Sequence, residues 1–233
     1  MPLVAAAVLP HPPLLVPDVA AGAASELDEL RAACDDAVAR VLAARPQVIC
    51  VLGTAPETRR YDFPYRASFA AWGVPVEASL GDATQASPAL PLSVAVGVWL
   101  LTRARSTPPT TVVTVDGFAP AADCVRLGQE ISRGGSVGLL AMGDGSACRT
   151  LKAPGYLDPR AEPFDRAVTK ALADADTEAL LALDPALAAE LMVAGRAPWQ
   201  VLAGAAGGRY RGEVLYDEAP YGVQYAVATW LPA

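Results

Sequence analysis

The sequence predicts an α/β fold in which a mostly parallel central sheet is flanked by helices, within one domain that spans residues 1–233. Short apolar runs recur along the chain, and loops rich in Gly, Pro or Asp follow them, as is typical of buried parallel strands. Stretches with helical spacing of apolar residues separate these runs, so strand, helix and strand follow in βαβ order. Hydrophobic residues make up 53% of the chain, so a sizeable core is available.

The first βαβ unit lies at the N-terminal end of the chain. Residues 3–9 form a short apolar run that predicts a buried strand. The His-Pro-Pro sequence of residues 11–13 cannot continue a strand ladder, so it is expected to be a loop. Residues 25–44 show the spacing of a helix, and residues 48–52 form the second buried strand. Residues 53–56 are prone to turn, so the second strand is expected to end before them.

The later elements continue this pattern. Further strands are expected at residues 110–115, 136–142, 209–217 and 223–230. Further helices are expected at residues 90–105, 119–133, 162–174, 176–182, 184–193 and 197–206. Residues 57–88 mix short strand-like pieces with Gly and Pro and receive no assignment. Residues 149–161 are rich in Pro and Gly, and we expect a functional loop over the sheet there.

Charge and composition argue against several classes of function. The formal net charge is −7, whereas nucleic acid requires clustered Lys and Arg. We find no basic amphipathic helix, no apolar run of about 20 residues and no positively charged leader, so we expect no membrane partner. The cysteines are far apart and form no CxxC pair, which favours buried thiols over disulfides or a zinc site; they are Cys34, Cys50, Cys124 and Cys148. We expect a soluble, cytoplasmic protein.

Polar residues follow four of the expected strands. His11 follows the first strand, Thr54 the second and Asp116 the third, while Asp144 and Ser146 follow the fourth. Because ligands of open α/β sheets bind beyond the C-terminal ends of the strands, these residues outline a candidate cleft.

His11 is the only histidine of the chain, and two interpretations remain open for it. Imidazole is the commonest neutral metal ligand and the usual base near neutral pH. Without other information, a structural histidine bonded to a backbone carbonyl is the favoured alternative. The segment from Gly143 to Ser146 could bind an anion through backbone N–H groups, but a tight turn is favoured there. No P-loop or GxGxxG motif is present, and no GxSxG nucleophile elbow supports a serine hydrolase.

Other candidates have equally plain alternatives. Cys148 could be a thiolate ligand or a nucleophile, although most free cysteines are simply buried. Arg59 and Arg60 could receive a carboxylate or a phosphate, although surface solvation is the favoured role. Glu190 and Glu218 are candidate carboxylate ligands that no local pattern supports. From the residues alone, the chain is an α/β protein with a cleft of unknown use.

Four groups of segments, in a fixed order, resemble the motifs of one known family. They are Leu9-Pro10-His11-Pro12-Pro13-Leu14-Leu15-Val16-Pro17, then Met142-Gly143-Asp144-Gly145-Ser146-Ala147, then Ala153-Pro154-Gly155-Tyr156 with Pro163-Phe164-Asp165, and finally Tyr216-Asp217-Glu218-Ala219-Pro220-Tyr221-Gly222-Val223-Gln224-Tyr225. The chain thereby resembles the class III extradiol ring-cleavage dioxygenases of the catalytic B-subunit type and their Memo-like relatives. The resemblance covers almost the whole chain and implies the fold of that family.

The resemblance also implies a set of functional positions. In the family, two histidines and a glutamate hold non-haem Fe(II), and a further histidine acts as acid and base. His11 matches the first histidine. The other positions fall on Ala55 or Thr54 for the second histidine, on Ala147 for the acid/base histidine, and on Val193 for the glutamate, with Glu190 about one turn away. The metal site is therefore expected to be degenerate.

Three functional hypotheses follow. The first is a pseudoenzyme that has lost Fe(II)-dependent ring cleavage and binds a small molecule or a protein partner in the old cleft, without a cofactor. The second is a metal-dependent oxidoreductase, perhaps dioxygenase-like in chemistry, in which His11 joins an altered ligand set drawn from Asp144, Cys148 and Glu190 and holds Fe(II) or another divalent metal. The third is a metal-free enzyme that uses Cys148 or Asp144. Oligomerisation is common in the family, so a homodimer is expected.

Overall fold

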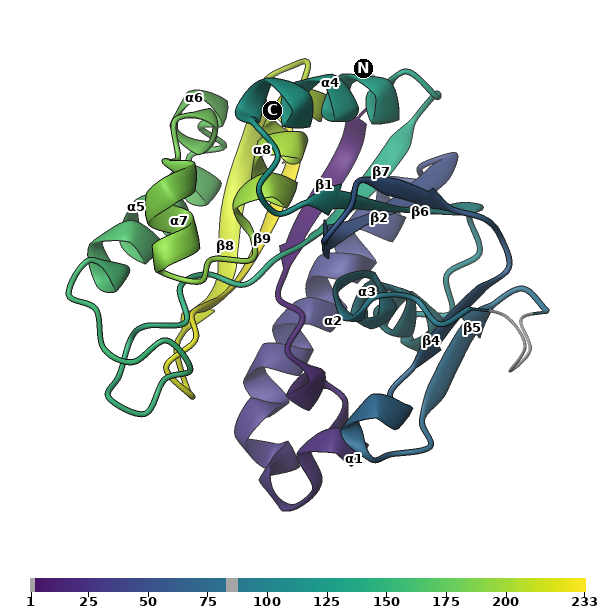
Figure 1. Ribbon diagram of the computed structural model, residues 1–233. Helices are drawn as coiled ribbons and strands as arrows, with labels where there is room; N and C mark the ends of the chain where they lie inside the picture. Colours follow the sequence, from purple (N-terminus) through teal and green to yellow (C-terminus); the bar gives the residue numbers. More distant parts are fainter. Residues whose placement is uncertain (1–2, 83–87) are drawn as a thin grey trace.

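A seven-stranded sheet forms the centre of the computed structural model, which describes residues 3–82 and 88–233 (Figure 1). The strand order is β3-β6-β2-β7-β1-β9-β8. The strands are β1 (Leu3–Leu9), β2 (Val48–Ala55), β3 (Arg59–Tyr61), β6 (Thr110–Asp116), β7 (Val137–Met142), β8 (Tyr210–Glu218) and β9 (Tyr225–Pro232). Strands β6, β2, β7 and β1 run parallel, whereas β3 on one side and β9 and β8 on the other pair antiparallel. The predicted α/β class with a mostly parallel sheet is confirmed.

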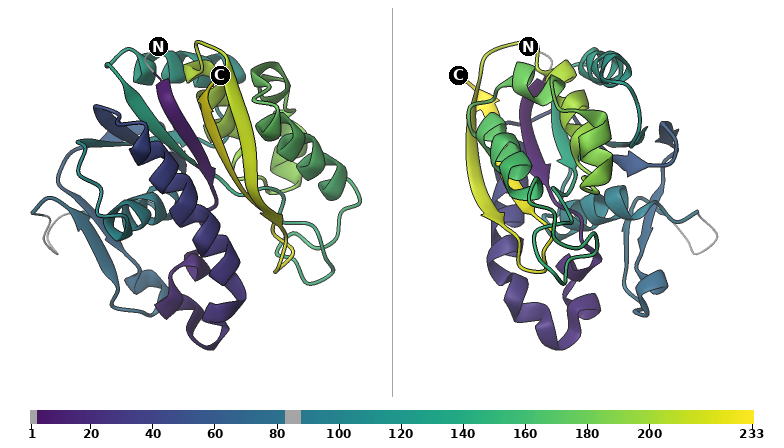
Figure 2. Two further views of the ribbon diagram at one scale, coloured as in Figure 1. Left: turned by 180° about the vertical axis from the view of Figure 1, so that it is seen from behind. Right: turned by 60° about the vertical axis from the view of Figure 1, so that its left-hand side comes forward.

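Helices cover both faces of this sheet (Figures 1 and 2). The helices are α1 (Pro17–Ala20), α2 (Asp28–Ala43), α3 (Leu92–Arg103), α4 (Ala121–Ser132), α5 (Ala161–Ala173), α6 (Thr177–Leu181), α7 (Pro185–Glu190) and α8 (Arg196–Ala205). Helices α2 and α3 pack on one face, and α4 to α8 pack on the other. The predicted helices and most of the predicted strands are confirmed to within a few residues.

Strand β1 shows why this arrangement buries so much of the chain. Successive side chains of a strand point to opposite faces. Ala6 and Val8 accordingly join the core beneath α4 to α8, whereas Ala5, Ala7 and Leu9 join the core beneath α2 and α3. Both faces are covered, so β1 is a nearly continuous apolar run rather than an alternating one.

Two local expectations need correction, and one stretch for which no element was expected contains strands. Strand β2 continues through Ala55, although residues 53–56 were expected to turn, because its pairing with β6 runs on to the Ala55–Asp116 partners. Helix α2 begins at Asp28, and residues 21–27 ahead of it form a 3₁₀ helix instead of its first turns. The stretch of residues 57–88, for which the sequence predicts no element, contains β3 and a separate two-stranded sheet that packs beside α3. Residues 83–87 of this stretch lie outside the described ranges. That small sheet consists of β4 (Tyr65–Ser68) and β5 (Glu77–Leu80).

The predicted state of the cysteines is confirmed, because all four are free and buried.

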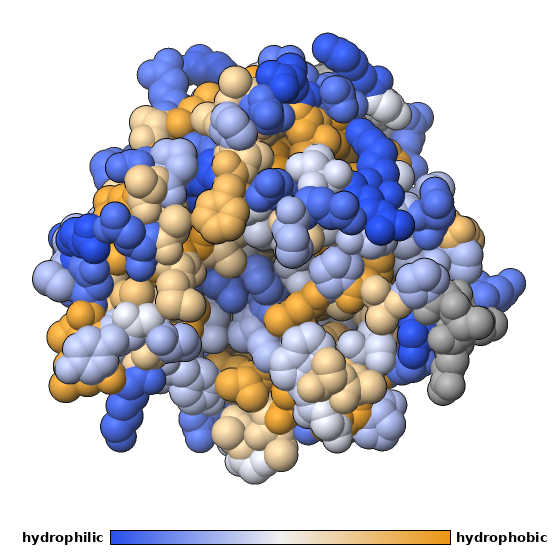
Figure 3. Space-filling model, viewed as in Figure 1, coloured by the Kyte–Doolittle hydropathy of each residue, from blue (hydrophilic) through white to orange (hydrophobic). Residues whose placement is uncertain are grey.

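Hydrophobic and hydrophilic residues alternate in small patches over the face seen in Figure 3. Within the described ranges, no helix has both the length and the apolar character needed to cross a membrane.

Candidate functional site

The C-terminal ends of β1, β2, β6 and β7 meet at one edge of the sheet, where the connection between α7 and α8 packs against them. The Gly143 N–H donates to the carbonyl of Leu9 over 2.8 Å and so extends the β1–β7 pairing by one residue. The Gly195 N–H donates to the carbonyl of Asp144, also over 2.8 Å. A Cβ on Gly143 would lie 2.3 Å from the Cα of Gly195, so the two backbones touch where only glycine fits.

His11 is almost enclosed at this edge, with 9% of its surface exposed. Its backbone N–H donates to Oδ1 of Asp144 over 2.8 Å, so this carboxylate ties the loop after β1 to the loop after β7. The imidazole Nδ1 lies 3.8 Å from the same oxygen and is buried, and it has no hydrogen-bond partner among residues 3–82 and 88–233. The backbone-carbonyl bond expected of a structural histidine is therefore not made by Nδ1.

The other positions that the resemblance assigns to iron chemistry lack metal donors. Ala55 and Ala147 are buried methyl groups, and Val193 is half-buried. The hydroxyl of Thr54 donates to the carbonyl of Ala194 over 2.7 Å, which uses its proton to brace the loop before α8. A facial site for catalytic Fe(II) requires two histidines and a carboxylate around one point. These residues do not fit that requirement.

The remaining candidate ligands do not complete a metal site. Glu190 is more than half exposed and forms an ion pair with Arg160, with an Oε2–Nη1 distance of 2.6 Å. Cys148 donates to the carbonyl of Leu191 over 3.5 Å, and burial followed by nearby carboxylates raises the pKa of its thiol. A raised pKa keeps this sulfur protonated near neutral pH, which suits neither a thiolate ligand nor a nucleophile. Throughout residues 3–82 and 88–233, no three His, Cys, Asp or Glu side chains lie together as a metal-binding group.

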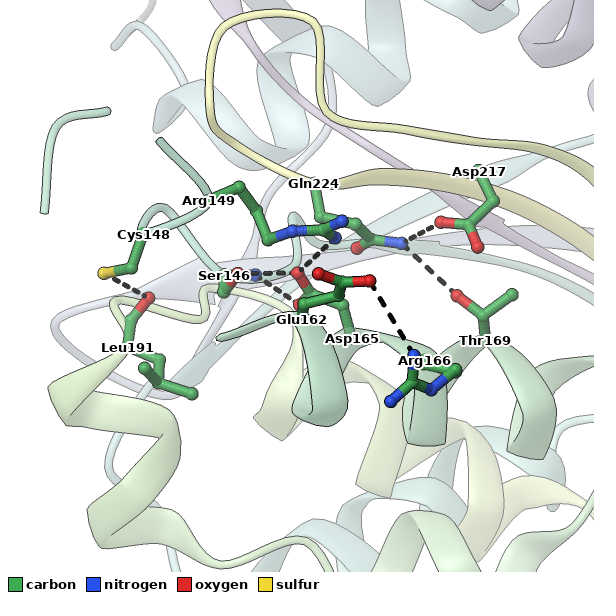
Figure 4. Close-up of polar contacts among 10 residues, drawn as sticks. All are labelled: Ser146, Cys148, Arg149, Glu162, Asp165, Arg166, Thr169, Leu191, Asp217 and Gln224. Carbon is green, nitrogen blue, oxygen red and sulfur yellow. Dashed lines mark hydrogen bonds and ion pairs between the residues drawn. The ribbon is translucent and has the colours of Figure 1, made fainter. Parts of the chain in front are cut away.

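Ser146 belongs to a buried network on the α5 side of the loop (Figure 4). Oδ1 of Asp165 accepts the Ser146 N–H over 2.9 Å, and Oδ2 accepts the Ser146 hydroxyl over 2.6 Å and Nη1 of Arg149 over 3.1 Å. Burial nevertheless outweighs these donors and raises the pKa of Asp165. The Ser146 hydroxyl thus serves to hold its loop on α5 and is not poised as a nucleophile.

Of the other charged candidates, Asp116 lies at this edge but is bonded within its own loop, and the rest face solvent. Arg59 is exposed, lies 5.1 Å from the Tyr61 ring centroid and is paired with Glu57 at 3.5 Å. Oδ1 of Asp116 accepts the Phe118 N–H over 2.9 Å and so shapes the loop after β6. Exposed Arg60 lies on the edge strand β3, and exposed Glu218 ends β8.

A cavity of about 210 Å³ opens at the C-terminal edge beside these loops. It is lined by Thr54, Gly117, Phe118, Pro185, Ala188, Ala189, Met192, Val193, Ala194 and Arg196. Val193 lines it, and so does Thr54, one of the two residues to which the resemblance assigns the second histidine; Ala55, the other, and His11 are not among the lining residues. Phe118 and Met192 are 79% and 51% exposed, so they form the outer rim of the cavity.

Arg196 is the lining residue that sequence reasoning missed. Arg196 is 2% exposed although it carries a full positive charge. It is the first residue of α8, and no sequence motif marks this position as part of a site. A usable signal was its spacing from Gln200, because residues four apart on a helix can bond, and Nη1 of Arg196 donates to Oε1 of Gln200 over 2.8 Å.

Fold and site together define an α/β domain with a small, mostly apolar cavity at the C-terminal edge of its parallel strands. No protein-family model matches the chain, and no curated protein sequence matches it. Among solved structures, an uncharacterized protein, JW3007, from Escherichia coli K12 is similar over 98% of this chain and 99% of its own, with a TM-score of 0.52 and 16% sequence identity. At this identity the likeness supports the fold over the whole length and assigns no activity.

Proposed function

We propose that this chain is a binding protein on a fold like that of the class III extradiol dioxygenases and their Memo-like relatives. In this proposal it has lost Fe(II)-dependent ring cleavage and holds a small molecule in the old cleft. The observation that carries the proposal is the lining of the cavity, which includes Val193 and Thr54. By the resemblance, Val193 takes the place of the glutamate ligand, and Thr54 or its neighbour Ala55 takes the place of the second histidine. A small concave site with apolar walls and few polar groups is typical of ligand-binding pockets.

The donor chemistry supports loss of the original reaction. Ring cleavage requires a metal that retains open positions for a catecholate and dioxygen, which three protein ligands leave free. His11 has Asp144 as its carboxylate neighbour, and the positions of the second histidine and the glutamate carry no donor that could join them. Removal of one neutral ligand and the carboxylate lowers both the donor count and the negative charge that balances a divalent cation.

A metal-dependent oxidoreductase with an altered ligand set is the second candidate, and one observation favours it. The Nδ1 atom of His11 is buried without a partner, 3.8 Å from Oδ1 of Asp144. Buried polar atoms are normally satisfied, so an orphaned imidazole nitrogen beside a carboxylate is a candidate pair of metal donors. The metal-free enzyme gains no such support, because Cys148 is buried and its pKa is raised.

Metal counting separates the two candidates. The protein would be purified anaerobically, exposed in turn to Fe(II), Mn(II) and Zn(II), and its bound metal counted by native mass spectrometry. His11→Ala is the test variant, and Glu178→Gln, which removes an exposed charge on α6, is the control. We expect no His11-dependent metal and no turnover of catechols under dioxygen. About one metal per chain that His11→Ala removes would refute the binding-protein proposal and favour the oxidoreductase.

A further inference from the structure

The geometry points to a specific ligand class for this cavity: we propose that it binds a small monocarboxylate with an apolar body, whose carboxylate pairs with Arg196. This inference rests on the proposed binding function and adds the chemistry of the ligand. It is carried by the combination of a cavity with apolar walls and a buried guanidinium that has no acidic partner.

The hydrogen bonds of Arg196 lead only to neutral oxygens. Nη1 donates to the carbonyl of Ala119 over 2.7 Å and to Oε1 of Gln200 over 2.8 Å, and Nη2 donates to the carbonyl of Gly117 over 2.5 Å. A guanidinium carries five N–H groups in a planar fork. Three of them have these acceptors, which leaves two without an acceptor among the described residues.

The positive charge is also uncompensated. Among residues 3–82 and 88–233, no carboxylate lies within ion-pair distance of Arg196, although 12 ion pairs between other Arg or Lys residues and carboxylates are formed. The neighbouring acids are engaged elsewhere, since Asp116 accepts the Phe118 N–H and Asp123 pairs with Arg126 at 2.6 Å. Buried charges are usually paired, because an unpaired ion loses its hydration without compensation. An anionic ligand would supply the missing charge.

Two further features agree with an anion. No side chain caps the N-terminus of α8, at whose first position Arg196 lies, so its positive end is not offset by an acidic cap. The planar fork of arginine matches a carboxylate in a two-bond geometry. The uncapped helix end and the planar fork support the assignment of an anion site, but the assignment depends on the buried guanidinium.

The size and walls of the cavity define the rest of the ligand. An apolar cavity of about 150 Å³ holds a benzene molecule, so a volume of about 210 Å³ leaves room for a ring of that size with a carboxylate attached. Ala188, Val193 and Met192 supply apolar wall, so the body of the ligand should be apolar and about the size of a benzene ring. Benzoate is therefore a suitable probe, and benzamide is its neutral counterpart of the same shape.

Methionine methyl signals report binding at this place. The chain contains three methionines, of which Met192 lines the cavity and Met142 is fully buried in β7. With ¹³C-methyl methionine labelling, benzoate should shift the Met192 signal saturably and leave the Met142 signal in place. Since hydrogen bonds to charged groups are about twice as strong as neutral ones, we expect benzoate to bind at least about tenfold more tightly than benzamide.

Variants locate the effect. Val193→Phe should fill the cavity and abolish binding of both probes, whereas Arg196→Met should abolish the preference for benzoate. Arg166→Met, which removes an exposed charge from α5, is the matched control and should change neither affinity by more than about twofold. Should Arg196→Met fail to fold, the comparison of benzoate with benzamide on the natural chain decides alone.

The outcomes separate this inference from the proposed function. Equal affinity for the two probes, abolished for both by Val193→Phe, would overturn the carboxylate assignment and leave a binding pocket standing. The absence of a Met192 shift with either probe, or binding that Val193→Phe does not affect, would overturn the assignment as well. The proposed function itself is tested separately and fails if about one metal per chain is bound and His11→Ala removes it.

Discussion

Replacement of Asp165 by alanine tests whether the loop after β7 is held to α5 by this buried carboxylate. The side chain is 2% exposed and accepts three hydrogen bonds, two from Ser146 and one from Arg149. Its loss leaves the buried Ser146 N–H without an acceptor, which costs about 1–3 kcal/mol, and removes bonds to a charged group of about 1.5–3 kcal/mol each. Because Arg149 is partly exposed and can be rehydrated, we expect a total loss of about 3–4 kcal/mol in the free energy of unfolding.

Urea unfolding at pH 7 and 25 °C measures this loss. Ser146→Ala removes one bond to the charged group and should cost about 1.5–3 kcal/mol. The double variant with Asp165→Ala should cost less than the sum of the single changes, because the two residues share bonds. A loss below about 1 kcal/mol for Asp165→Ala would refute the assigned role, since that is the size of one ordinary hydrogen bond.

The pH dependence gives an independent check through Asp165→Asn, which keeps the shape of the protonated acid. Burial raises the pKa of Asp165 in the folded chain above its unfolded value. A group with a raised folded pKa stabilises the fold most below its unfolded pKa, and this contribution is lost as the pH rises through the folded pKa. The natural chain should therefore gain stability relative to Asp165→Asn as the pH falls from 7 toward 4. If the natural chain instead loses stability relative to Asp165→Asn as the pH falls, hydrogen bonding outweighs burial in setting the pKa of Asp165.

Three further predictions follow from features described above. Gly143→Ala should lower the free energy of unfolding by about 2 kcal/mol or more, because the added Cβ would meet the backbone of Gly195. Urea unfolding measures this loss, and a change below about 0.5 kcal/mol would contradict the contact. The four thiols, Cys148 included, should react with a thiol reagent much more slowly in the folded chain than in denaturant, and rapid reaction of one thiol would refute its burial. The family resemblance predicts a homodimer, which light scattering would detect as twice the chain mass of 24.0 kDa.

Much of the fold was predictable because it depends on patterns of apolar residues along the chain. The run at residues 3–9 and the helical spacing of residues 162–174 bury their side chains in the structure as expected. The end of β2 was not predictable, since Gly53 favours a turn locally and only pairing with β6 keeps the strand extended to Ala55. Tertiary pairing overrides local preference at such positions.

The candidate site was predictable only in part, for a related reason. The rule that loops at the C-terminal edge form the site places His11 and Asp144 together, and the structure joins them directly. The roles of Asp165 and Arg196 depend on partners far along the chain, such as Ser146 and Ala119, which no local pattern contains. A buried charge becomes recognisable only when its surroundings are known.

The contact between Gly143 and Gly195 bears on how quickly a ligand can exchange. It fixes the loop before α8, and with it Val193 and Ala194, to the rigid end of β7. A wall anchored in this way exists before the ligand arrives, so association pays little ordering entropy and requires no slow rearrangement. The exposed rim residues Phe118 and Met192 can change rotamer on the picosecond-to-nanosecond scale, far faster than backbone loops move. We therefore expect association limited by diffusion and residence times set by affinity alone.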